Sequence, residues 1–267
     1  MISNAGFELE HGTGWSRGLR PMLRRENGLW WRSRRWLVQS LLWTLLLNGL
    51  LFTALFVFPA LQTPEGDPAI TDDPVLVGAQ LFLGVGMMAL AVGAIILLQD
   101  TVLGEREGGT AEWVLSKPLS REAFILAKLV ANLGGTLVTM ILVPGLVGFL
   151  LFYLYDPQAM SPAGFAKAQA TVAAHTWFYV TLTLMMGTLL SSRAAVLGLP
   201  FASLLGGGLV PIASLVRLSP WRLGQVALLV LEGQPLDGGG LTMIAATVLW
   251  SVLFVVVAVW RFSRTEI

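Results

Sequence analysis

Side chains that could carry catalysis or bind a metal are few in this chain. Its 267 residues include no cysteine and only two histidines, His11 and His175, so thiolate metal sites and cysteine nucleophiles are excluded. No GxxxxGK[ST], HExxH or GxSxG pattern occurs. An isolated histidine such as His175 could bind a ligand, or could cap a helix at a membrane interface. The sequence predicts no catalytic residue, no metal site and no ATPase motif of its own.

Charged side chains gather in one stretch, GEREGGTAEWVLSKPLSREAF at 104–124. It carries seven charges, whereas only 12% of the whole chain is charged. Gly108-Gly109 predict the end of one helix, and Thr110 can cap a short second helix. Glu112 then lies in the first turn, where a carboxylate complements the helix dipole.

This short helix has a predicted end as well as a predicted start. Lys117 precedes Pro118 and is therefore biased away from helical geometry, which limits the helix to about six or seven residues. Ser120 can cap the next helix. Because so short a helix is unstable alone in water, its apolar residues, Trp113 among them, are expected to dock on another surface.

The composition places this stretch in a membrane protein. The chain is 55% hydrophobic with a mean hydropathy of +0.73, which is more apolar surface than one soluble core of this length could bury. A bilayer core requires about 20 apolar residues per helix. Six stretches reach that length: 37–58, 75–98, 124–152, 171–190, 195–216 and 241–260. We therefore expect an all-α membrane protein of six spans, with Lys128 reaching outward to the interface from the long third span.

The distribution of basic residues predicts the orientation, because positively charged segments stay on the cytoplasmic side. With the N-terminus inside, fourteen of the seventeen Lys and Arg residues fall in inner segments, and Lys167, Arg217 and Arg222 fall outside. The first outer loop, PALQTPEGDPAITDDP, has four acids and no base. The expected arrangement is a cytoplasmic leader, 1–36, a membrane domain of six spans, 37–260, and a cytoplasmic tail, 261–267, in the cell (inner) membrane.

Two further segments are expected at the membrane interfaces. The leader alternates arginines with Trp30, Trp31 and Trp36, which fits either a topology signal or an amphipathic helix along the inner surface, although Gly28 argues against one unbroken helix. Outside, 221–231 is too short to cross the bilayer beside its neighbours and is predicted to form a short helix.

The span interiors contain polar and small residues but no charge at their middles. Ion-coupled carriers usually need such a charge. Asn48 and Thr139 are expected to hydrogen-bond between helices. Gly206 to Gly208, flanked by Pro200 and Pro211, predict either a broken fifth span or a place of close helix packing.

The charged stretch resembles a signature of ABC-2 type transporter permeases, E-x-G-T-x-E-x-L-L-S-x-P-[LV]-S-R. The matching residues are Glu105-Arg106-Glu107, Gly109-Thr110, Glu112, Leu115-Ser116, Pro118-Leu119-Ser120-Arg121 and Lys128. The similarity is greatest to the branch with permeases of sodium export, bacitracin resistance and nitrous-oxide-reductase maturation. Trp113 stands where leucine is usual. Because the expected spans and leader are also similar, the resemblance covers nearly the whole chain.

The resemblance implies the permease subunit of an ABC exporter. A separate P-loop subunit would bind ATP and Mg, with no cofactor in this chain, and a second permease copy or a homologous permease would complete a dimer. Residues 110–116 would form a coupling helix that docks on the ATPase. The implied ATPase contacts are Glu105, Arg106, Glu107, Gly109, Thr110, Glu112, Trp113, Val114, Leu115, Ser116, Pro118, Ser120 and Arg121.

The resemblance also implies that spans two and five line the dimer interface. Candidates for a translocation path there are Gln80, Gly84, Ser203, Gly206, Gly207 and Gly208. Two other classes of function stay open on the residues alone, namely a membrane scaffold or assembly factor that transports nothing and an ion-coupled secondary carrier. Nucleic acid is not an expected partner, because the net charge is only +1.

Overall fold

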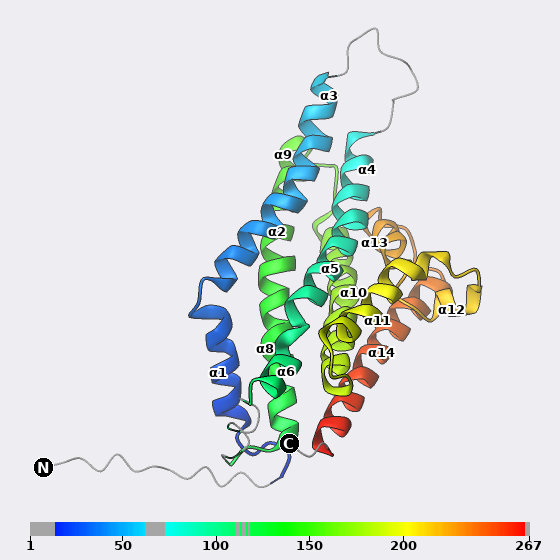
Figure 1. The fold of residues 1–267 in the computed structure, drawn as a ribbon. Coiled ribbons are helices and arrows are strands. Elements are labelled where there is room, and N and C mark those ends of the chain that lie inside the picture. The colour runs from blue at the N-terminus through cyan, green and yellow to red at the C-terminus, as the bar shows by residue number, and fades with distance from the viewer. Residues whose placement is uncertain (1–13, 62–72, 110–112, 114–115, 117, 265–267) are drawn as a thin grey trace, which may run out of the picture.

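A computed structural model describes residues 14–61, 73–109, 113, 116 and 118–264. These residues form a bundle of helices, with no strand among them (Figure 1). The prediction of an all-α fold is confirmed for this part of the chain.

Four helices are long and apolar enough to cross a membrane, and they correspond to predicted spans one, two, three and six. Their bounds are Arg35–Leu61, Pro74–Glu107, Arg121–Tyr155 and Gly238–Ser263. The first comprises α2 (Arg35–Phe52), η1 (Thr53–Val57) and α3 (Phe58–Leu61). The second comprises α4 (Pro74–Ala79), η2 (Gln80–Val85), α5 (Gly86–Leu98) and α6 (Asp100–Glu107). The third comprises α8 (Arg121–Thr136), η3 (Leu137–Leu142) and α9 (Val143–Tyr155), and the last is α14.

A π-helical segment interrupts each of the first three spans, at η1, η2 and η3. Pro59 follows η1 and Pro144 follows η3, each two residues beyond the segment's end. Proline has no N–H to donate, and its ring clashes with the carbonyl four residues earlier in a regular α-helix. The wider π turn lies at that carbonyl in both spans, which accounts for two of the three interruptions.

The helix α10 (Pro162–Leu189) contains predicted span four and lies at the centre of the bundle (Figure 1). It packs against α14, α13 and α5, and 19 of its 28 residues are buried. It is not among the four apolar spans, because its side chains meet other helices rather than lipid and therefore include threonines. His175 is only 6% exposed and packs edge-on against Tyr179 within α10, so it does not cap the end of this helix.

Predicted span five is interrupted. The helix α11 (Arg193–Gly206) continues into the 3-10 turn η4 (Gly207–Leu209), and after residues 210–212 a new short helix, α12 (Ala213–Arg217), begins. The alternative of a broken helix within 195–216 is therefore confirmed. The short helix predicted at 221–231 is also found, as α13 (Leu223–Leu231).

The leader forms a helix that belongs to the folded bundle. The helix α1 (Leu19–Trp31) runs without a break through Gly28, so the expected interruption there was wrong. It packs against α8, and its residue Met22 joins an apolar core with α5, α6, α10 and α14. A second apolar core, built around Phe82, Phe152 and Phe165, fills the other half of the bundle. The start of α1 and the end of α14 lie at the same end of the molecule (Figure 1).

Candidate functional site

Four charged side chains meet where α6 ends the second span. Lys128 of α8 has its Nζ 2.9 Å from Glu105 Oε1 of α6 and 3.1 Å from Glu26 Oε1 of α1. The guanidinium of Arg25, also on α1, lies 3.2 Å from Glu105 Oε1 and 3.4 Å from Glu26 Oε1. We call these four residues the ionic cluster. It joins α6 and α8, which flank one loop, to α1, which lies far from both in the sequence.

The ionic cluster is largely closed to solvent. The side chain of Lys128 is 2% exposed and that of Glu26 is 4% exposed, whereas Arg25 is 38% exposed at the edge. Burying a charge costs several kcal/mol unless an opposite charge compensates it. Two cations and two anions balance here, so each residue depends on the others. The prediction that Lys128 reaches outward was wrong, because α1 covers it and supplies the compensating carboxylate of Glu26.

The position of Glu26 follows from the packing of α1 alongside α8. The backbone N–H of Ser120 donates to the carbonyl of Arg17 at 2.9 Å, near the start of both helices. Further along, the indole N–H of Trp30 donates to Asn132 Oδ1 at 3.2 Å. The contacts advance in the same direction on both helices, so α1 and α8 run parallel and bring Glu26 level with Lys128.

Gly135 allows the two helices to approach closely. Trp30 is 1% exposed, and its ring fills the space beside this glycine. A Cβ atom at residue 135 would lie 2.3 Å from the ring, which is too close for any side chain. The neighbouring Gly134 has open space at the same position. The close contact therefore requires glycine at 135 specifically.

Arg106, the next residue of the motif, is directed toward the end of α10. Its guanidinium donates to the carbonyls of Gly187, Thr188 and Leu190, at 3.4 to 3.5 Å. The last carbonyls of a helix lack partners within the helix and carry partial negative charge, so a cation is favourable there. Arg106 thus fixes the end of α6 against the central helix.

Two more acids of α6 face the start of α11. Arg193 lies 2.9 Å from Asp100 and 3.9 Å from Glu107. These side chains are about half exposed. Exposed pairs of this kind contribute little stability, about 0 to 1 kcal/mol. Glu107 therefore stays accessible for an external contact, unlike Glu105.

The segment after the loop is also attached to the bundle. Ser120 caps α8 as predicted, since its hydroxyl oxygen accepts the N–H of Ala123 at 3.0 Å, and its hydroxyl also contacts the carbonyl of Trp15. Gly18, with φ +74°, lies so close to Pro118 and its neighbour that a Cβ would be 2.9 Å from the Pro118 carbonyl. The leader therefore holds the chain where it enters α8.

Arg121 connects the start of α8 with the end of α14. Its guanidinium donates to the carbonyl of Ser263 at 3.3 Å. Nearby, the rings of Phe124 and Phe262 are stacked with centroids 5.1 Å apart. The first turn of α8 is therefore in contact with both the leader and the last helix.

The middle of the loop is only partly within the described residues. Gly109 ends α6 with φ +66°, a left-handed conformation suited to glycine. Trp113 is 62% exposed, and the hydroxyl of Ser116 donates to its carbonyl. Four of the predicted ATPase contacts lie outside the described residues: Thr110, Glu112, Val114 and Leu115. The coupling helix therefore stays a prediction.

The structure divides the predicted contact residues into two groups. Glu105, Arg106, Ser120 and Arg121 bond to the bundle itself, whereas Glu107, Gly109, Trp113, Ser116 and Pro118 are exposed. Sequence reasoning missed the leader's contribution, namely Arg25 and Glu26. The signal was present, because Glu26 is the one acid of an otherwise basic helix.

The candidates for a translocation path lie in two places, one beside α13 and the other beside Trp221, which precedes α13. Gln80 and Gly84 belong to η2, and a Cβ at Gly224 of α13 would lie 3.9 Å from the Cα of Gly84. The other group includes Ser203, whose hydroxyl oxygen accepts the indole N–H of Trp221, just before α13, at 3.3 Å.

The three glycines of the second group differ in their surroundings. A Cβ at Gly207 would lie 2.2 Å from the ring of Trp221. At Gly206 and Gly208, nothing lies within 4 Å of the position that a Cβ would occupy. Close packing, the other alternative for these glycines, therefore holds at Gly207 alone.

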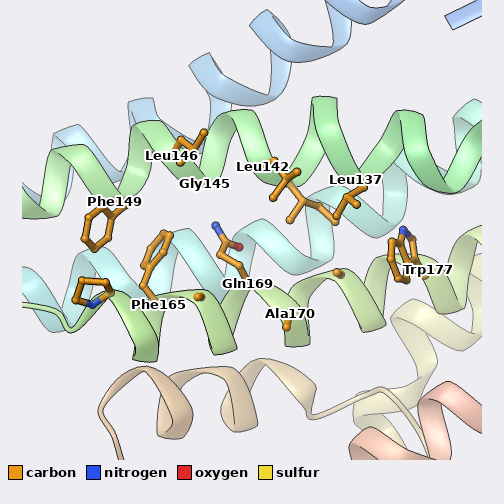
Figure 2. Close-up of a pocket in the computed structure, with 13 residues that line it drawn as sticks. Leu137, Leu142, Gly145, Leu146, Phe149, Phe165, Gln169, Ala170 and Trp177 are labelled. Atoms are coloured by element: carbon orange, nitrogen blue, oxygen red, sulfur yellow. The ribbon is translucent and has the colours of Figure 1, made fainter.

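An apolar groove lies on a different face, between the third span and α10 (Figure 2). Its volume is about 550 Å³, and its wall includes Leu142, Phe149 and Phe165. Gln169 extends between the two helices toward Gly145 (Figure 2), and a Cβ at that glycine would lie 2.3 Å from its amide nitrogen. None of the predicted path residues lines this groove.

Within the described part of the chain, no group of three or more His, Cys, Asp or Glu side chains could hold a metal ion. The long apolar helices and the buried cluster at their common end define a multi-pass membrane protein.

The family comparison agrees with this class. A model of the ABC-2 family transporter protein matches residues 32–267, and the chain therefore belongs to the ABC-2 transporter family. Members of this family are membrane components of ABC transporters and not ATPases themselves. No curated protein sequence matches the chain.

Proposed function

We propose that this chain is the permease subunit of an ABC exporter, driven by a separate ATPase that docks on the loop 104–124. ATP and Mg would be bound by that partner. The observation that carries the proposal is the attachment of both ends of the loop to the bundle, through Glu105 near its start and Ser120 near its end.

This attachment gives a docked subunit a mechanical connection to the membrane helices. The helix Pro74–Glu107 runs from the loop through the whole second span, so displacement of its end moves α5 as well. Ser120 caps the start of the third span, so displacement of this end of the loop moves α8 as well. The ionic cluster keeps α1, α6 and α8 together, so a force on the loop acts on three helices at once.

In this proposal the exposed residues of the loop make the external contact. Trp113 and Glu107 are accessible, and residues 110–116 would supply the coupling helix. Glu105 and Arg106 instead hold the loop in place. Both termini would be cytoplasmic, since the described ends of the chain lie on the side of this loop (Figure 1).

The wider arrangement is part of the same proposal. Two permeases would pair through spans two and five, with six passes in each. The functional relatives would be the permeases of sodium export, bacitracin resistance and nitrous-oxide-reductase maturation. The path would run near α13, since Gly224 of α13 lies beside Gly84 and Trp221, just before α13, contacts Ser203 and Gly207.

The test is reconstitution with a P-loop ATPase encoded beside the gene. We expect the two chains to co-purify and the permease to stimulate ATP hydrolysis in liposomes. Glu112→Arg should leave membrane insertion intact and abolish this stimulation. Glu232→Arg, at the exposed opposite end, is the matched control and should behave like the wild type.

Two results would contradict the proposal. Unchanged stimulation by Glu112→Arg would remove the coupling role of the loop. An ATPase that binds but whose hydrolysis never responds to the permease would favour a scaffold without transport.

A further inference from the structure

The outer face of α1 carries a row of arginines around a gap. Arg20, Arg24 and Arg32 are spaced by multiples of four residues, and Gly28 occupies the remaining place in the row. Residues four apart lie on the same side of a helix. The glycine leaves a groove of about 610 Å³, which is lined by Arg20, Pro21, Arg24, Arg25, Gly28 and Arg32.

This row lies opposite the side of α1 that packs on α8. The buried residues are Met22, Glu26 and Trp30. Glu26 is the one acid of α1, and its carboxylate faces Lys128 and Arg25, so it does not neutralise the outer row. Like charges four residues apart destabilise a helix. An anion in the groove would remove that repulsion.

The surroundings of the groove indicate the kind of anion. Trp31 is 41% exposed and lines a second groove that shares Arg20, Arg24, Gly28 and Arg32 with this one. Val38, in the first turn of the spanning helix that follows α1, is 54% exposed. Indole rings favour the headgroup region of a bilayer. A ligand that fills this site therefore meets guanidinium groups and the indole ring of Trp31, and the exposed apolar start of α2 follows α1 in the chain.

We propose that this groove binds the phosphate-bearing headgroup of an anionic phospholipid from the adjacent leaflet. Guanidinium groups bind phosphate oxygens in a bidentate manner. The acyl chains would lie against the exposed start of α2. This site goes beyond the proposed function, because it requires neither the ATPase nor a particular cargo.

Arg25 connects the lipid site with the ionic cluster. Its side chain lines the groove and also lies 3.2 Å from Glu105 at the end of α6. A bound headgroup shares this guanidinium with Glu105. Lipid binding therefore influences how firmly α1 and α6 are held together.

The experiment is native mass spectrometry of the full-length protein in neutral detergent. Phosphatidylglycerol and phosphatidylcholine with identical acyl chains are titrated in parallel. We expect tighter binding of phosphatidylglycerol. Because each arginine near a membrane surface contributes about fivefold in affinity, the triple variant R20Q/R24Q/R32Q should lose at least about tenfold.

Two further variants separate the groove from charge alone. Gly28→Leu fills the groove without changing the charge, and its Cβ meets only Arg32 Cδ at 3.8 Å, so the helix tolerates it. It should weaken phosphatidylglycerol binding as well. The variant K167Q/R217Q/R222Q removes three exposed charges elsewhere and should bind phosphatidylglycerol like the wild type.

Several results would overturn the proposal. Equal affinity for the two lipids would do so, as would unchanged binding by R20Q/R24Q/R32Q or by Gly28→Leu. Complete displacement of phosphatidylglycerol by inorganic phosphate would make this a site for a free ion. Loss of ATPase-subunit binding with normal lipid binding would assign the arginine row to a protein partner.

Discussion

Lys128 and Glu105 form an ion pair of 2.9 Å inside the bundle, although Lys128 lies near the start of the third span and Glu105 near the end of the second. The pair joins the two helices that enter and leave the loop 104–124. A direct interaction between the two ends of a loop limits how they can move independently. The proposed coupling depends on this contact together with the bonds of Arg106 and Ser120 to the bundle.

Replacing Lys128 by methionine should destabilise the protein. The change leaves Glu26 and Glu105 facing each other without their buried cation, and breaking a buried pair costs about 3 to 5 kcal/mol. Thermal unfolding in detergent, followed by size exclusion, measures the effect. Arg193→Gln removes an exposed pair and should change the midpoint little. A Lys128→Met protein as stable as the wild type would show that the ionic cluster has no structural role.

Gly135→Ala should displace α1 from α8. The added methyl group collides with Trp30, and overpacking of this kind costs about 1 to 3 kcal/mol. The arginines of α1 should then be cut faster by trypsin. Gly134→Ala is the matched control, because its methyl group has open space. Equal cleavage of both variants would contradict the close packing of Trp30.

Alanine at Gly207 and alanine at Gly206 in span five should have different effects. Gly207→Ala should lower the thermal midpoint, because Trp221 fills the space next to it. Gly206→Ala should be neutral or stabilising by up to about 1 kcal/mol, since alanine favours the helical state and nothing obstructs it. If Gly207→Ala and Gly206→Ala have the same thermal midpoint, the packing of Trp221 does not hold the interruption of span five in place.

Single cysteines can test the orientation, since the natural chain contains none. Cysteine at Ala163, an exposed residue at the far end of α10, should react with a membrane-impermeant maleimide on intact cells. Cysteine at Ser116 should react only after permeabilisation. The reverse pattern would place the loop outside and refute docking of a cytoplasmic ATPase.

Crosslinking can test the pairing of two permeases through span five. Leu205 and Leu209 are 58% and 84% exposed, so cysteines there should form disulfides between two copies. Cysteine at Leu146 is the control, because it is 71% exposed on α9, away from span five. Crosslinks at Leu146 alone would indicate a different interface.

Local features of the fold were predictable because nearby residues determine them. The cap at Ser120, the end of α6 at Gly108-Gly109 and the break near Gly207 all follow from short-range chemistry. Hydropathy also predicted the four apolar helices and most of α10, but it missed the first nine residues of α10, 162–170, which are too polar to be recognised as part of a span.

Long-range contacts of polar residues were not predictable in the same way. The expectation for Asn48 was right, since its amide donates to the carbonyl of Pro144 on another helix. The expectation for Thr139 was wrong, because its short hydroxyl donates to the carbonyl of Gly135 in its own helix. Lys128 was misplaced because its partner Glu26 lies 102 residues away, and the basic leader around that acid concealed its role.

The separation of Glu26 and Lys128 also has a consequence for biosynthesis. The ribosome completes α1 first, but the surface that receives it is made 102 residues later, after two spans have been translated. At about 5 to 20 residues per second, α1 waits roughly 5 to 20 seconds for α8. During that interval Glu26 has no lysine to pair with, so the leader completes its fold only when the third span arrives.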